Sequence, residues 1–202
     1  MELNNTFYAR PTAQRIAAWG AATPPAFRFI VKGQRGASWR AMRGGAADSV
    51  PWLTETLVGF GERLGAVLFR VPGEMPRDDD ALDALLAAWP RALPLVVEPQ
   101  HASWHVDETI ARLRDASAVL CATDLDGTDE PPLRRTGAFL YLRLRRSSYD
   151  EDALDRWARR LVPFLDDGMD AFVVLRHDPD GRNALLAESF PGRVERARRS
   201  GP

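Results

Sequence analysis

The chain has 202 residues, of which 45% are hydrophobic and 27% are charged, so it is long enough to bury one sizeable core. Its net charge of −1 provides no overall field for nucleic acid or a membrane surface, which makes a small-molecule partner the better fit. One cysteine excludes an intramolecular disulfide, and no signal peptide or apolar run of membrane-spanning length is recognisable. We therefore expect a cytoplasmic protein in a reducing compartment, and no cofactor is indicated.

Seven short apolar segments are predicted to be strands. They lie at residues 1–3, 27–31, 66–69, 95–97, 118–122, 139–144 and 171–175. Helical patterns separate most of them, beginning with a helix after Pro11 for which Thr12 is the predicted N-cap. Repeated strand–helix units predict parallel strands with right-handed crossovers, either doubly wound or closed as a barrel. Polar residues after the strands, and the absence of a glycine-rich dinucleotide fingerprint, favour an α/β fold of the TIM-barrel type.

The segments between strands carry signals for helix starts and for loops. Residues 50–64 are predicted to form one helix with Pro51 in its first turn, preceded by a glycine-rich loop at 36–45. Asp78 to Asp80 should cap the helix that follows them, and Ser148 has the capping-box spacing for another. Four tryptophans on apolar helix faces are expected in the core: Trp19, Trp52, Trp89 and Trp157.

The stretch from Leu93 to Trp104 is the most informative part of the sequence. A short apolar strand there runs into a polar cluster that contains Glu98 and His101. Parallel α/β folds present catalytic groups in this way, at the carboxyl ends of strands. We therefore expect Glu98 or His101 to transfer a proton, with the alternative that the two only satisfy each other as a hydrogen-bonded pair.

Charged residues also follow other predicted strands. The cations are Lys32, Arg70 and Arg143. With the carboxylates of Glu2, Glu98 and Asp124 they would form a mixed-charge pocket suited to an anionic or polyhydroxylated ligand. The alternative is that the cations are solvated charges on the rim.

Metal and thiol chemistry are the weaker hypotheses. His101 and His105, with Glu98 and His177, can build a histidine–carboxylate metal centre, but the next helix is predicted to begin after His105, so no metal site is predicted. Cys121 lies in an apolar strand and is expected to be a small core residue rather than a nucleophile.

Six segments carry a family resemblance. They are ELNNTFY at 2–8, FRFIVKGQR at 27–35, VLFRVP at 67–72, VVEPQHASW at 96–104, YLRL at 141–144 and DPDGRNA at 178–184. In order and spacing they resemble the motifs of the YecE-like family, domain of unknown function 72, which implies a TIM-barrel-type fold with no established activity. Carried over to this chain, the resemblance implies a site with Glu98 and His101 as catalytic candidates. The matching substrate-binding candidates are Glu2, Asn4, Tyr8, Lys32, Trp104, Asp124, Tyr141 and Arg143, to which we add Arg70, and Thr6 is a further position that matches the family's motif.

The chain departs from the family's usual pattern at several polar positions. These are Arg70, Gln100, Arg145 with Arg146, and His177 with Asp178, where the family usually has Gln, Arg, His-Gly and Asn-Asn. The family also usually begins with an extra strand that carries a Gly-Thr-Ser-Gly-Trp motif. We therefore expect residues 1–192 to form a single, N-terminally truncated barrel domain of seven strands, followed by an Arg-rich tail at 193–202. Open barrel edges would permit self-association.

Three function classes follow from these residues. The first is an enzyme that uses acid/base chemistry on a small anionic or sugar-like substrate. The second is a ligand-binding or regulatory relative that has lost the chemistry. The third is a metal-dependent hydrolase or isomerase.

Overall fold

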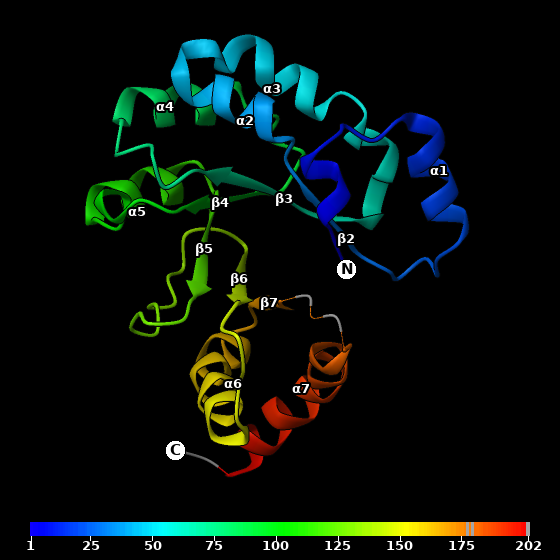
Figure 1. Ribbon diagram of the computed structural model, residues 1–202, viewed down its shortest axis with the longest axis vertical. Helices are drawn as coiled ribbons and strands as arrows, with labels where there is room; N and C mark the ends of the chain where they lie inside the picture. The colour runs from blue at the N-terminus through cyan, green and yellow to red at the C-terminus, as the bar shows by residue number, and fades with distance from the viewer. Residues whose placement is uncertain (177, 179, 201–202) are drawn as a thin grey trace. The chain divides into compact units, whose positions relative to one another are not determined.

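The computed structural model describes residues 1–176, 178 and 180–200. In this part of the chain, seven parallel strands are each hydrogen-bonded to the next in chain order. They are β1 (Glu2–Leu3), β2 (Phe29–Lys32), β3 (Leu64–Val71), β4 (Leu95–Pro99), β5 (Val119–Asp124), β6 (Phe139–Leu144) and β7 (Asp170–Leu175). Helices separate most of them (Figure 1). This is a TIM-barrel-like α/β fold, as the sequence predicted.

The helices are α1 (Ala13–Ala21), α2 (Arg35–Arg40), α3 (Ala46–Thr54), α4 (Asp79–Ala88), α5 (Asp107–Asp115), α6 (Glu151–Asp166) and α7 (Arg182–Ser200). Several of the helices begin at a residue whose side chain caps them, among them α1, α2, α4 and α6. Short helical turns add η1 (Asn4–Phe7), η2 (Ala41–Gly45), η3 (Leu57–Arg63) and η4 (Ala102–Trp104). The Thr12 side chain accepts from the backbone N–H of Arg15 at 3.2 Å, and the Asp78 side chain accepts from that of Ala81 at 2.9 Å. Both predicted caps are confirmed.

The chain divides into two compact units, residues 1–120 and the residues from Cys121 onward. In unit 1, one face of the sheet is apolar and helix-covered. Its strand residues include Val31, Val67, Phe69 and Val97. They pack in one cluster with residues of the helices, among them Ile16, Leu53, Leu85 and Leu113. Burial of this apolar surface is the main stabilising contribution to unit 1.

Unit 2 has its own core between strand β6 and helices α6 and α7. Leu142 and Leu144 pack with Trp157 of α6 and Val194 of α7. The adjacent Arg193, only 6% exposed, donates to Glu151 at 2.6 Å and to Asp155 at 2.8 Å. Residues 193–200, which the sequence indicated as a tail, thus continue α7 and contribute to its packing on α6.

Two helix boundaries differ from the sequence prediction. The single helix expected over 50–64 is two elements, because α3 ends at Thr54 and the chain turns through Gly61 (φ 53°) within η3. The loop expected over 36–45 is largely helical, with a kink at Gly44 (φ 86°). A Cβ at Gly45 would lie 2.9 Å from the Arg40 carbonyl oxygen, so the kink requires glycine there.

Two side-chain expectations are also corrected. The cap of α6 is Asp150, which accepts from the N–H of Ala153 at 2.7 Å, and Ser148 lies before it. Asp150 is the residue at the helix start with extended backbone, so its oxygen reaches the free N–H. Trp52 is not a core residue, because its ring is on the surface beneath the Arg10 guanidinium, 4.6 Å from the ring centroid.

Within the described ranges, helices long and apolar enough to cross a membrane are absent.

Candidate functional site

Four charged residues of unit 1 share one face of its sheet. In a parallel sheet, register partners point to the same side and residues two apart along a strand do so as well. Glu2 is the register partner of Ile30, and Ile30 is two residues before Lys32 on β2, so Glu2 and Lys32 point to the same side. Lys32 in turn is the register partner of Leu68, which is two residues before Arg70 on β3. Arg70 pairs with Glu98. Glu2, Lys32, Arg70 and Glu98, here called the charged face, therefore lie opposite the helix-covered apolar face.

Three of these residues are at the carboxyl ends of adjacent strands. Lys32 is the last residue of β2, while Arg70 and Glu98 are the penultimate residues of β3 and β4. The Glu98 side chain is only 2% exposed, whereas Arg70 is 32% exposed. Their closest atoms, Glu98 Oε2 and Arg70 Nε, are 3.7 Å apart, which is an ion-pair separation and longer than a hydrogen bond.

Lys32 is buried beside an aromatic ring. Its Nζ is 4.6 Å from the ring centroid of Phe7, a cation–π contact. The hydroxyl of Thr6 is 2.8 Å from the Lys32 carbonyl oxygen and 2.6 Å from that of Leu3. The turn η1 is thereby held against the ends of β1 and β2, so the motif at 2–8 packs around Lys32.

Two predicted ligand residues of this motif are on the surface. Asn4 is exposed, and Tyr8 is 78% exposed with its ring edge-on to Phe7 at a centroid separation of 5.5 Å. They flank the buried part of η1, where the Thr6 side chain anchors the turn. Tyr8 therefore offers an open aromatic surface near the carboxyl end of β1.

The loop after β4 places His101 and Trp104 in different roles. The Nδ1 atom of His101 contacts Ser103, accepting from its N–H at 3.2 Å and lying 2.8 Å from its Oγ. Among the described residues His101 makes no hydrogen bond to Glu98, so the expected pair is not formed. Trp104 is buried, and its Nε1 donates to the Met75 carbonyl oxygen at 2.9 Å. That contact links the loops after β3 and β4.

In unit 2, Tyr141 and Arg143 share a face of β6, with Thr123 as the register partner of Arg143. Both are buried, and the Tyr141 ring lies against Phe172 of β7 with centroids 6.3 Å apart. This face is opposite the one that carries Leu142 and Leu144 toward α6 and α7.

Asp124 lies on that opposite, helix-facing side of unit 2, because it pairs with Leu144. Asp124 is fully buried. Its carboxylate accepts hydrogen bonds from three side chains: Arg146 Nε at 2.8 Å, the Tyr149 hydroxyl at 3.0 Å and Trp157 Nε1 at 3.2 Å. Burial, with the adjacent Asp124 carboxylate, raises the pKa of Tyr149, and the hydrogen bond to Asp124 raises the pKa of Arg146. This arrangement fixes the loop after β6.

The metal hypothesis gains no support from the described residues. Within 1–176, 178 and 180–200 there is no group of three or more His, Cys, Asp or Glu side chains that could hold a metal ion. His177, one of the four proposed ligands, lies outside these residues. Burial lowers the pKa of His105, and a hydrogen bond to the backbone of Pro99 offsets part of this lowering. Cys121 is buried and not in a disulfide.

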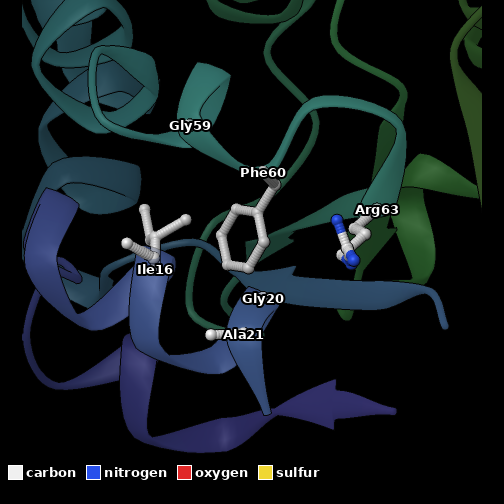
Figure 2. A pocket seen from close by; sticks show the side chains of 7 residues that line it. Ile16, Gly20, Ala21, Gly59, Phe60 and Arg63 are labelled. Carbon is white, nitrogen blue, oxygen red and sulfur yellow. The ribbon is translucent and has the colours of Figure 1, made fainter. Parts of the chain in front are cut away.

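A separate groove of about 360 Å³ lies between α1 and η3 of unit 1. Figure 2 shows Ile16 and Phe60 along it, with the guanidinium of Arg63 at one side. Arg63 precedes the first residue of β3, so the groove lies near the amino ends of the strands. It is thus distinct from the charged face, whose residues follow the strands.

Comparison with known proteins gives the family. The family model described as "Protein of unknown function DUF72" matches residues 1–201. The chain belongs to this family. A DUF72 protein structure from Thermotoga maritima MSB8 has a TM-score of 0.81 at 23% identity, covering 96% of this chain and 84% of that one. Another from Enterococcus faecalis V583 has a TM-score of 0.75 at 18% identity, covering 96% and 87%. These likenesses show the fold. Among curated proteins, none matches.

Sequence reasoning missed two residues of the Asp124 cluster. Arg146 stood out only as a departure from the DUF72 pattern, and Tyr149 was not singled out. The available signal was the short separation between the end of β6 and α6, which places both residues in one tight connection.

Proposed function

We propose that the charged face of unit 1 binds a small anionic or sugar-like molecule at the carboxyl ends of β2, β3 and β4. The observation that carries this proposal is the in-register pair of Arg70 and Glu98 next to the buried Lys32. Burying a carboxylate and an ammonium group costs several kcal/mol per ion in desolvation, which even a close charged partner often does not fully offset. An apolar residue at either position would be cheaper for folding alone, so a ligand role explains both.

The chemistry of the face selects the ligand class. Lys32 and Arg70 offer charge-assisted donors for a carboxylate or phosphate, whereas Glu2 and Glu98 accept hydrogen bonds from hydroxyl groups. The Arg70 Nε is buried and makes no hydrogen bond among the described residues, but the side chain as a whole is 32% exposed, so the rest of its guanidinium can reach a ligand oxygen. A phosphorylated or carboxylated sugar combines both kinds of group.

Glu98 and His101 are the residues that can transfer a proton to or from such a ligand. Glu98 is nearly inaccessible to solvent, and a carboxylate in such an environment is a suitable general base or acid once a substrate is bound. A ligand-binding protein without turnover would use the same contacts, so binding and turnover are measured separately.

The test is thermal stabilisation by a fixed panel: inorganic phosphate, glycerol 3-phosphate, glucose, gluconate and glucose 6-phosphate. Lys32→Met removes the cation at the carboxyl end of β2, and Arg28→Met is the matched control before the start of the same strand. We expect at least one phosphorylated or carboxylated sugar to raise Tm in the wild type and in Arg28→Met, but not in Lys32→Met. Equal stabilisation of both variants, or none by any compound, would refute the site.

A further inference from the structure

We infer that Ser103 holds His101 as the tautomer protonated on Nε2, so that His101 serves the site as a hydrogen-bond donor and Glu98 as the proton acceptor. The role in ligand binding rests on the function proposed above. The tautomer itself does not depend on any ligand and is tested without one.

The first step is the geometry at Nδ1. The Ser103 backbone N–H donates to His101 Nδ1 at 3.2 Å, and this requires a lone pair on that nitrogen. A proton on Nδ1 would face the N–H of Ser103. The neutral ring therefore carries its proton on Nε2.

The second step is the direction of the Ser103 hydroxyl. The backbone N–H of Arg77 donates to Ser103 Oγ at 2.7 Å, so this oxygen already accepts one hydrogen bond. Oγ is also 2.8 Å from His101 Nδ1, and its own proton can complete that contact. Two donors from Ser103 thus converge on Nδ1, and both favour the same tautomer.

The third step is the availability of Nε2. The contacts of the His101 ring within the described part of the chain involve Nδ1 alone, and the residue is only partly buried. A protonated Nε2, which has no hydrogen-bond partner within the described part of the chain, can donate to a bound molecule. Nε2 then has no lone pair to accept a proton and Nδ1 is occupied by Ser103, so of the two residues Glu98 is the base.

The experiment is NMR of ¹⁵N-histidine-labelled protein without ligand, recorded at pH 8 through two-bond ¹H–¹⁵N correlations. The chain has only three histidines, so His105→Gln and His177→Gln variants assign the signals. We expect His101 to show a protonated Nε2 and an unprotonated Nδ1. A predominance of the Nδ1–H tautomer, or an even mixture, would overturn the inference.

Substitutions at Ser103 test the cause. Ser103→Ala removes the hydroxyl but keeps the backbone N–H, and we expect the tautomer ratio to shift toward Nδ1–H by about fivefold. Ser103→Thr keeps the hydroxyl and should keep the wild-type ratio, while the exposed Ser189→Ala is the neutral control. An unchanged ratio in Ser103→Ala contradicts the role of the hydroxyl. Failure of the compound panel, by contrast, counts against ligand binding and leaves the tautomer result standing.

Discussion

Arg70 lies directly opposite Glu98 in the register of β3 and β4, with Arg70 Nε 3.7 Å from Glu98 Oε2. The carboxylate is almost fully buried while the guanidinium remains one-third exposed. Removing Arg70 and removing Glu98 should therefore affect the stability of the fold differently. Removing the cation leaves a buried negative charge with weaker compensation, whereas removing the carboxylate leaves a cation that solvent can still reach.

We expect Arg70→Met to lower the free energy of unfolding at pH 7 by about 1–2 kcal/mol, less than for a fully buried pair because Arg70 is partly solvated. Adding Glu98→Gln to that variant should recover about half of the loss, because the less well compensated buried charge is gone. Urea unfolding of both variants measures this, with the exposed Arg91→Met as a control that changes stability by less than about 0.5 kcal/mol. A double variant that is less stable than Arg70→Met would contradict this account of the pair.

Asp124 should be essential to the stability of unit 2. Asp124→Asn removes a buried negative charge that accepts from Arg146, Tyr149 and Trp157, and it leaves the guanidinium poorly compensated. We expect a loss of about 2–4 kcal/mol in the free energy of unfolding. The matched control is Asp126→Asn, an exposed carboxylate that accepts from the Ser147 N–H, with a loss below about 1 kcal/mol. Similar losses in the two variants would show that Asp124 contributes no more than a loop contact.

The buried Tyr149 predicts a specific sensitivity to alkaline pH. Its pKa is raised in the folded state above the ordinary value of 10.0, so the folded protein holds the phenolic proton more tightly than the unfolded chain does. The resulting stabilisation is fully present below pH 10 and is lost as the pH rises from there toward the folded-state value. Urea unfolding from pH 8 to 11 should therefore show a steeper decline for the wild type than for Tyr149→Phe. Tyr8→Phe, at an exposed tyrosine, should follow the wild type, and a parallel decline in all three proteins would assign the alkaline loss to other groups.

The strands could be predicted because a parallel strand buried on both faces appears as a continuous apolar run that ends in polar residues. The same property hid the position of Asp124. Val119 to Cys121 are all buried, so β5 shows no alternation from which the face of its last residue could be inferred. Only the register with Leu144 places Asp124 on the helix-facing side.

The helix expected over 50–64 shows a second limit. Leu53, Leu57 and Phe60 have helical spacing and are all buried in the same core, so the apolar pattern was correct. Gly59 and Gly61 lie within this pattern, but the regular helix already ends at Thr54, and the positive φ of Gly61 breaks the short helical segment η3 that follows. Hydrophobic periodicity reports which side chains face the core, and a turn between elements can preserve it. For the candidate site, residue types after each strand identified the charged face, but the contact between Ser103 and His101 depends on loop geometry.

Neighbouring residues of the loop after β4 hold the loop after β3 at two points: Ser103 Oγ receives the Arg77 N–H, and Trp104 Nε1 donates to the Met75 carbonyl. Each bond joins a side chain of one loop to the main chain of the other. These two bonds therefore do not depend on the side chains of residues 72–77, provided that the backbone path is kept, whereas they do depend on the side chains of Ser103 and Trp104. For protein engineering, the two loops have to be transferred together. A graft of residues 72–77 into a related barrel would need residues 101–104 as well, because these supply the side chains that hold the first loop.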